Sequence, residues 1–417
     1  MLAAEGRRSP AGGSAQPLQW PATPIANHCE PCVMTFKKTF LALLLGTCLA
    51  TGASAAANDP VKLAVLADLS GGNALVGNNW RRGVDLAVEQ LNSQGGILGH
   101  RIEVNVLDGQ TNPGVARGLV QRILQDEPYV ILDGTNSASI RAITPLIEQA
   151  GISQFFNGDA ALLTASGYKS AFRTGLGQGT ALPRLAEYAK QQLKVAKVGL
   201  LWANNDFGRG GRDVIAKEFQ RLGVEVVSDQ SSEAGQVDFS ADVQKLKGAG
   251  ADAVFLYLNE EDTVRFLRAA KAQALPAKII GETTLGTQSV INLAGDVADG
   301  AISHVTFSPE LQTPQAQAFT QLYKQKYNSL PDHNNFKGYI AVQTINAVAK
   351  RQGKIDPQAF AEGLRGATVG VAEAPGVIFD THWSASGEIE HQSFVVKIDN
   401  GHANVVETLG NNVPAKP

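Results

Sequence analysis

The sequence predicts an α/β protein built from two Rossmann-like lobes. Short apolar strands alternate with amphipathic helices from residue 61 onward. The same alternation restarts after residues 172–175. The chain has 417 residues, 44% of them apolar, which is enough to bury two cores of ordinary size.

The first series of elements predicts a parallel sheet with helices on both faces. Glycines at 95, 96 and 99 end its first helix. The expected strands are 61–67, 101–107, 129–132 and 152–156, and the expected helices are 79–93, 113–125 and 137–150.

The second series has the same rhythm. Its expected helices are 179–193, 208–222, 239–248 and 261–274, and its expected strands are 197–202, 224–227, 253–258 and 277–280. After residues 303–308 we expect helices 314–327 and 336–351 and strands 377–379 and 393–398. These late elements are too few for a third domain, so we expect them to complete the first two.

Residues 34–55 have the pattern of a cleaved secretory signal. Lys37 and Lys38 precede an apolar run at 40–49, and Ala53-Ser54-Ala55 matches a cleavage site. The run is far shorter than the roughly 20 residues that span a bilayer. We therefore expect an exported, soluble protein, with Met34 as the true start and residues 1–33 as a non-native upstream extension.

All three cysteines, Cys29, Cys32 and Cys48, lie before the expected cleavage point. Cys48 is an alternative lipidation site, but Thr47 stands where a smaller residue is expected before it. Cys29-x-x-Cys32 is a lone pair and indicates neither a zinc site nor a redox motif.

The charge balance argues against nucleic acid as a partner. Cleavage removes four of 36 basic and two of 39 acidic residues, which leaves 32 against 37. No basic run or basic–aromatic interleaving follows the signal. A mildly acidic, mixed surface is typical of a soluble monomer.

The motifs of common enzymes are absent from the sequence. It contains no G-x-S-x-G, H-E-x-x-H or phosphate-loop pattern. The run Gly175-Leu-Gly177-Gln-Gly179 misses the dinucleotide pattern because Thr180 stands at the third glycine position. His333 has no partners at metal-ligand spacing, so we expect no metal site. Because the enzyme and dinucleotide motifs are absent, we also expect no cofactor and no enzyme activity.

Small polar residues follow most of the predicted strands. Because ligands of parallel sheets lie beyond the carboxyl ends of the strands, these loops predict a site for a small polar ligand. Ser137 starts a helix whose free N–H groups favour an anion such as a carboxylate. The alternative is that Ser137 is only a helix cap. The loops are 68–72, 133–137, 157–159, 204–208, 259–261 and 281–284.

Several segments together resemble periplasmic substrate-binding proteins of the leucine/isoleucine/valine type. The resemblance covers residues 61–400 and is carried by VKLAVLADLSG (61–71), GVDLA (83–87), GGILG (95–99), NNDFGRG (204–210), DFS (238–240), GETTL (281–285) and PDHN (331–334). It implies the type I periplasmic binding protein fold, with ligand between two lobes and a hinge crossed near 173–175, 303–308 and 373–377. The implied lobes are 58–174 with 307–374, and 175–306 with 375–412.

The resemblance also implies a set of ligand contacts. Ser137, beside Asn136, would hold a ligand carboxylate, assisted by N–H groups of the loop from Asn157 to Asp159. Asp159 would meet an ammonium group. Phe207 takes the place of a tyrosine that covers this group. Glu282, or Thr283 in the competing register, would supply a second ammonium contact, and Asn259 and Val76 replace aromatic wall residues.

Each of three contacts has a structural alternative. Asp159 could cap a turn at 160–164, Phe207 could belong to the second core, and Glu282 could be a solvated loop charge.

The expected function is that of a periplasmic solute receptor that delivers a branched-chain-like amino acid to the permease of an ABC importer. The alternatives are an amide, urea or an aromatic or aliphatic carboxylate as ligand, or a ligand sensor that partners a receptor. A nucleotide-dependent oxidoreductase is the remaining alternative.

Overall fold

The structure is a computed structural model that describes residues 58–410. The predicted extension, signal and cysteines lie outside these residues. The described residues all belong to one compact unit. Within 58–410, no helix is both long and apolar enough to cross a bilayer.

A five-stranded parallel sheet forms the first lobe, in the order β2-β1-β3-β4-β5. Leu63 and Val65 of β1 pack on one face with Trp80, whereas Leu66 packs on the other face with Val120. Both faces of the sheet are therefore buried, as its apolar strands predicted. The strands are β1 Val61–Ala67, β2 Ile102–Asp108, β3 Val130–Gly134, β4 Ser153–Phe156 and β5 Ala171–Arg173.

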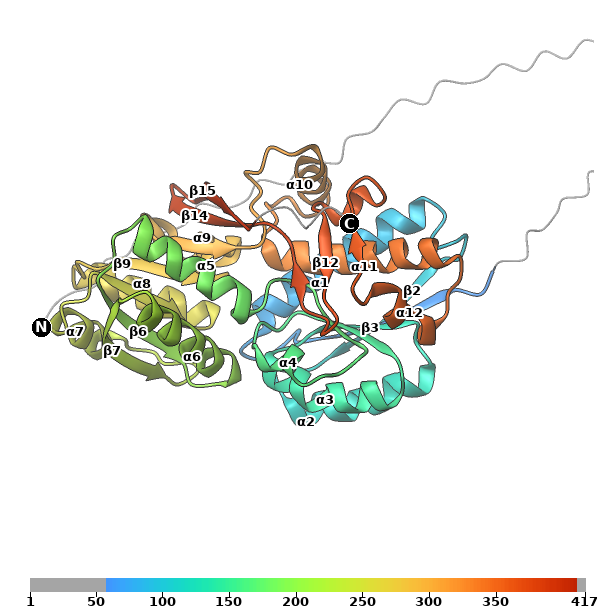
Figure 1. The fold of residues 1–417 in the computed structure, drawn as a ribbon, viewed down its shortest axis with the longest axis horizontal. Helices are drawn as coiled ribbons and strands as arrows, with labels where there is room; N and C mark the ends of the chain where they lie inside the picture. The colour runs from blue at the N-terminus through green and yellow to red at the C-terminus, as the bar shows by residue number, and fades with distance from the viewer. Residues whose placement is uncertain (1–57, 411–417) are drawn as a thin grey trace, which may run out of the picture. The chain divides into compact units, whose positions relative to one another are not determined.

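Helices cover both faces of this sheet (Figure 1). On one face, α2 (Pro113–Ile123) packs on α3 (Ser137–Gln149). On the other, α1 (Ala74–Ser93) packs along α11 (His333–Gln352). The close approach of α1 and α11 requires a glycine, since a Cβ on Gly83 would lie 1.9 Å from the Asn335 carbonyl oxygen.

The second lobe contains a seven-stranded sheet in the order β15-β14-β10-β9-β8-β6-β7. Only β14 runs opposite to the other strands; it pairs antiparallel with β10 on one side and with β15 on the other. The strands are β6 Lys197–Ala203, β7 Glu225–Ser232, β8 Ala253–Tyr257, β9 Lys278–Glu282, β10 Ile302–Val305, β14 Ser393–Asp399 and β15 His402–Leu409.

Five helices cover this second sheet. Helices α5 and α6 bury Leu185 and Phe219 on one face, and α7, α8 and α9 bury Val243, Phe266 and Ile291 on the other. The helices are α5 Gln178–Gln191, α6 Asp206–Arg221, α7 Ser240–Gly248, α8 Glu260–Ala272 and α9 Gln288–Ala294.

The remaining elements mostly complete the first lobe. The short helix α4 (Leu162–Ala165) precedes β5; α10 (Pro314–Tyr327) and α12 (Pro357–Leu364) flank α11 in the chain. A small sheet is formed by β11 (Thr368–Val369), β12 (Thr381–Trp383) and β13 (Ile389–Glu390). Trp383 packs edge-on against Phe155 and donates a 3.0 Å hydrogen bond to the Arg173 carbonyl oxygen.

The chain passes between the two sheets at residues 174–177, 306–313 and 391–392. The first two crossings match the predicted positions. The third was predicted at 373–377, but residues 375–377 form a 3₁₀ turn against α11 instead of a strand. The chain crosses only after β13, because Trp383 holds the intervening residues beside the first sheet.

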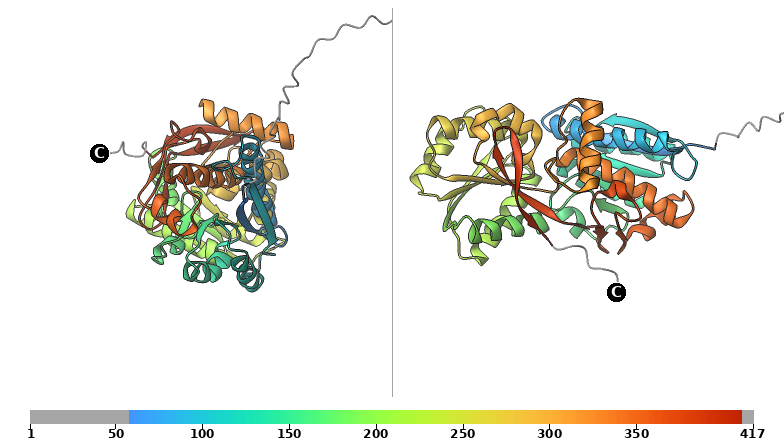
Figure 2. Two further views of the ribbon diagram at one scale, coloured as in Figure 1. Left: turned by 90° about the vertical axis from the view of Figure 1, so that its right-hand side faces the viewer. Right: turned by 90° about the horizontal axis from the view of Figure 1, so that it is seen from above.

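Strand β15 was not predicted. It pairs with β14 across a two-residue turn, Asn400-Gly401, whose φ angles are 51° and 79°. Figure 2 shows this red hairpin beside the yellow and green elements of the second lobe. An Asn-Gly pair with both φ positive is the strongest short-range hairpin signal, and it was present in the sequence.

Candidate functional site

A pocket of about 300 Å³ lies where strands of both sheets end. It is lined by loops that follow β3, β4, β6, β8 and β9, together with the start of α11. Seven of the eight predicted site residues line it: Asn136, Ser137, Asn157, Asp159, Phe207, Asn259 and Thr283. Val76 lines it too. The rule that ligands of parallel sheets lie beyond the carboxyl ends of strands therefore located this pocket.

The start of α3 forms one wall of the pocket. Asn136 is its N-cap, and its side-chain oxygen accepts a 3.0 Å bond from the Ser139 N–H. Ser137 is thus the first helical residue and not the cap, which removes the structural alternative for this serine. Within residues 58–410, the N–H groups of Ser137 and Ala138 have no protein acceptor, and both residues line the pocket.

Asp68, at the end of β1, holds the start of α3 in place. Its Oδ2 accepts bonds from the Asn136 N–H at 2.9 Å and from the Asn136 side chain at 3.0 Å. Its Oδ1 accepts the Thr111 N–H at 2.9 Å. Burial raises the Asp68 pKa, and these hydrogen bonds oppose the rise. Asp68 therefore positions the pocket wall without lining the pocket.

Asp159 is paired with a lysine that the sequence did not reveal as part of the site. Its Oδ1 lies 2.9 Å from the Lys337 Nζ, and the two side chains are only 9% and 2% exposed. Burial raises the pKa of Asp159, and Lys337 opposes that rise. Among the described residues, α4 has no side-chain cap, so Asp159 does not cap the turn near 160–164.

Phe207, near the start of α6, forms the wall contributed by the second lobe. Its ring stacks on Tyr257 with centroids 4.1 Å apart, and it also lines the pocket. Phe207 packs against the second core, as the structural alternative predicted, and it also remains half-buried at the pocket.

The acidic residues of the second lobe lie differently from the prediction. Glu282 is buried but is not among the lining residues, and its Oε1 lies 3.5 Å from the His304 Nδ1. It is therefore not a solvated loop charge. Thr283, the competing register, lines the pocket with φ of 54°. Glu260, at the first turn of α8, lines the pocket and had not been singled out.

Side-chain contacts between the lobes lie beside the pocket. Arg141 of α3 places its Nε 2.9 Å from Asp206 Oδ2 of α6. The Asn79 side chain of α1 donates to the Ser289 hydroxyl of α9 at 2.7 Å. Side chains of both lobes therefore hold the pocket walls together.

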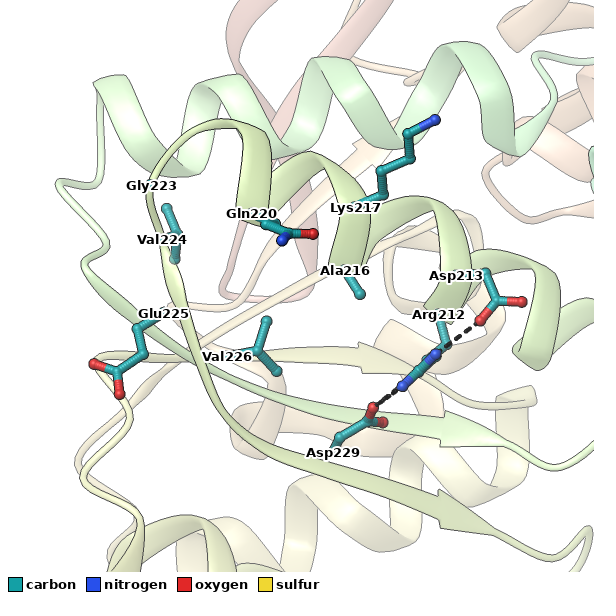
Figure 3. A pocket seen from close by; sticks show the side chains of 10 residues that line it. All are labelled: Arg212, Asp213, Ala216, Lys217, Gln220, Gly223, Val224, Glu225, Val226 and Asp229. Atoms are coloured by element: carbon teal, nitrogen blue, oxygen red, sulfur yellow. Dashed lines mark hydrogen bonds and ion pairs between the residues drawn. The ribbon is translucent and has the colours of Figure 1, made fainter.

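A larger groove of about 680 Å³ lies on α6 and the edge strand β7 (Figure 3). Its central cation is Arg212, which contacts Asp213 at 2.9 Å and donates from Nε to Asp229 at 2.8 Å. These charges already satisfy one another, and the groove lies away from the carboxyl edge of the sheet that forms the pocket.

Within residues 58–410, no cluster of three or more His, Cys, Asp or Glu side chains is placed to hold a metal ion. His333 is the first residue of α11 and is buried. Burial lowers its pKa well below the usual range, and the nearby Lys337 charge adds to this. It is a neutral helix-entry residue, as expected from its motif.

The fold and the position of the pocket define a class of two-lobed receptors, and the comparisons agree. The family model described as "Periplasmic binding protein" matches residues 60–403, so the chain belongs to this family. The chain is 28% identical to the leucine-, isoleucine-, valine-, threonine- and alanine-binding protein of Pseudomonas aeruginosa over 316 residues, which cover 75% of this chain and 84% of that protein.

Two solved structures share the fold. One is the branched-chain amino acid transporter substrate-binding protein LivJ of Streptococcus pneumoniae in complex with isoleucine, with a TM-score of 0.75, 22% identity and coverage of 84% of this chain and 99% of that one. The other is a solute-binding protein of an ABC transporter from R. palustris in complex with benzoate, with a TM-score of 0.76, 21% identity and coverage of 84% and 96%.

Proposed function

We propose that this protein is the periplasmic receptor of an ABC importer and that it binds a branched-chain-like amino acid in the pocket between its lobes. The observation that carries the proposal is the start of α3, where two N–H groups and the Ser137 hydroxyl face a pocket built from both lobes. The name of the Pseudomonas aeruginosa relative supports the ligand class.

The ligand carboxylate binds at the start of α3. Free N–H groups and the helix dipole make this end of a helix favourable for an anion. Gly158 allows the neighbouring loop to approach, because a Cβ there would lie 2.5 Å from Ile140 and 3.1 Å from the Ser137 Oγ.

The rest of the ligand lies against the second lobe. The Phe207 ring covers it, and an aromatic face attracts a cationic group. The pocket-lining residues Val76 and Asn259 contact its variable part. Glu282 is left out of this set because its side chain is not among the lining residues.

Binding by both lobes is also the signal to the transporter. A ligand shifts the lobe equilibrium only by as much as it prefers the closed form. A micromolar dissociation constant corresponds to about −8 kcal/mol, and part of it drives closure. The closed form then docks on the permease subunits of the importer.

The proposal includes export of the protein to the periplasm. The signal-like segment at 34–55 directs the chain to the periplasm and is removed. The family of the chain supports this location.

A second ligand class, an aromatic carboxylate, is favoured by one observation. Lys337 already neutralises Asp159, which had been predicted to meet an ammonium group. The R. palustris protein in complex with benzoate has the same fold.

Thermal unfolding and calorimetry with residues 56–417 test the proposal. We expect one or more of leucine, isoleucine and valine to raise the stability by about 2.7 kcal/mol when present at 100 times its dissociation constant. Ser137→Ala should weaken that binding at least about tenfold, which is about 1.4 kcal/mol. Binding of benzoate with no response to any amino acid would select the second class, and no response to either would contradict the proposal.

A further inference from the structure

The pocket has three carboxylates among its lining residues, and two of them already have cationic partners. Asp159 lies 2.9 Å from the Lys337 Nζ, and Asp206 lies 2.9 Å from the Arg141 Nε. The third is Glu260. Within residues 58–410, Glu260 makes no ion pair and no hydrogen bond with another side chain; its own backbone N–H bonds to its carboxylate, and the residue is only 5% exposed.

A buried carboxylate without a cationic partner is costly unless a ligand supplies one. The charges around Glu260 increase this cost. Asp332, the N-cap of α11, and Asp159 both act on Glu260 as negative neighbours, and the Lys337 charge opposes them. Burial is the main cause that raises the pKa of Glu260 to about 7; Asp332 and Asp159 add to the rise, whereas the backbone hydrogen bond and Lys337 oppose it.

Acceptor groups without partners line the same pocket. The side-chain oxygens of Asn157, Thr283 and Asn334 are buried and have no protein donor among the described residues. An ammonium group carries three N–H donors and a positive charge. A primary ammonium therefore satisfies both the charge and the surplus of acceptors in the pocket.

We propose that Glu260, and not Asp159 or Glu282, is the carboxylate that binds the ammonium group of the ligand and selects amino acids over acids that lack it. This inference rests on the proposed function. Asp159 keeps Lys337 neutralised and shapes the pocket beside Glu260. Glu282 contacts His304 outside the pocket lining.

The test compares matched pairs of ligands by calorimetry with residues 56–417. L-leucine is paired with 4-methylpentanoate, L-valine with 3-methylbutanoate and L-phenylalanine with 3-phenylpropanoate; each acid lacks only the amino group. Glu260→Gln should weaken the amino acid that binds best at least about tenfold, while binding of its paired acid stays equal or becomes tighter. The matched control is Glu261→Gln, because Glu261 is the next residue and is 73% exposed.

A pH series adds a readout that a structural role would not change. The ammonium binds ionised Glu260, so affinity for the amino acid should fall about tenfold from roughly pH 8 to 6, as the carboxyl group takes up a proton near pH 7. Affinity for the paired acid should not fall, and Glu260→Gln should flatten the amino-acid curve.

Equal losses for both members of a pair would overturn the role of Glu260, and so would unchanged binding of the amino acid. Wild-type protein that binds the acids but no amino acid would overturn this inference and leave a carboxylate receptor. Wild-type protein that binds neither would overturn the proposed function itself, and this inference with it.

Discussion

At the scale of single residues, the buried Asp159–Lys337 pair decides how any mutation at the site must be interpreted. Each charge lies in a dry environment and is compensated mainly by the other. Removing one member of such a pair leaves an unpaired buried charge, which typically costs about 3–5 kcal/mol. Weaker ligand binding by an Asp159 variant would therefore mix a lost contact with a damaged fold.

We expect Asp159→Ala to lower the free energy of unfolding by about 3–5 kcal/mol, because it leaves the Lys337 ammonium buried and unpaired. Urea unfolding measures this loss. The double variant Asp159→Ala/Lys337→Met should recover a large part of it. Asp85→Ala is the control, since Asp85 pairs with Arg81 on a partly exposed helix face and such pairs contribute about 1 kcal/mol or less. Equal costs for Asp85→Ala and Asp159→Ala would contradict this account.

At the scale of helices and strands, α3 and α6 form opposite walls of the pocket and are joined by the Arg141–Asp206 pair. Arg141 is 60% exposed and Asp206 18% exposed, so water and salt screen the pair. Its contribution to a closed pocket is therefore modest. Because it joins the two lobes, its loss should act mainly on how fast the ligand leaves.

We expect Arg141→Gln to weaken ligand binding by about 1 kcal/mol or less, mostly through faster release. Stopped-flow release at low and high salt measures this effect, and high salt should bring the wild type close to the variant. Arg209→Gln is a matched control: Arg209 contacts the same Asp206 at 3.6 Å, but within α6. Equal acceleration by both variants would show that the contact between lobes has no special role.

The elements themselves were largely predictable, because hydrophobic periodicity is a local property. Helix Pro314–Tyr327 was predicted with its observed bounds, and most other predicted elements differ by a few residues at their ends, whereas β5, α9, α12 and β12 were not predicted. The third crossing was misplaced because the contact that delays it, Trp383 with Arg173, joins residues far apart in the chain.

Some residues of the site could also be predicted from the sequence, and others could not. Ser137 and Phe207 follow strands directly, so their place at the pocket could be predicted from the strand ends. Lys337 comes from α11, 178 residues after Asp159, and local periodicity holds no information on that contact. A lysine inside the otherwise apolar run Phe336–Ile340 was the one available signal.

At the scale of the whole molecule, buried titratable groups act on stability in opposite directions. Burial lowers the pKa of His391 to about 4 from 6.5, so the unfolded chain binds more protons between these values. Stability from this group is present above pH 6.5 and is lost as the pH falls toward 4. Burial raises the pKa of Asp133 to about 7 from 3.8, so the folded chain binds the extra proton, and stability from this group is lost as the pH rises toward 7.

The two effects on stability overlap between about pH 4 and 6.5. We therefore expect these two groups to make the unfolding free energy of the wild type depend only weakly on pH. Variants that lack only one of the two groups should separate the two effects. From roughly pH 8 to 4.5, the loss of unfolding free energy caused by His391→Gln should shrink by about 2–3 kcal/mol. Only the wild type has a buried imidazole, whose neutral form becomes unfavourable as the pH falls. The cost of Asp133→Asn should grow by about 3 kcal/mol over the same interval, because protonation relieves the buried carboxylate only in the wild type.

Urea unfolding at several pH values measures both changes. The critical result is that the costs of the two variants change with pH in opposite directions. Asp133 accepts bonds from Thr135 and Gln154, so Asp133→Asn also loses these contacts, but that part of its cost should not depend on pH. His382→Gln is the control for histidine loss, since His382 is half-buried on β12. If both the His391 and Asp133 variants changed with the same sign, the opposition between buried imidazole and buried carboxylate would not describe this protein.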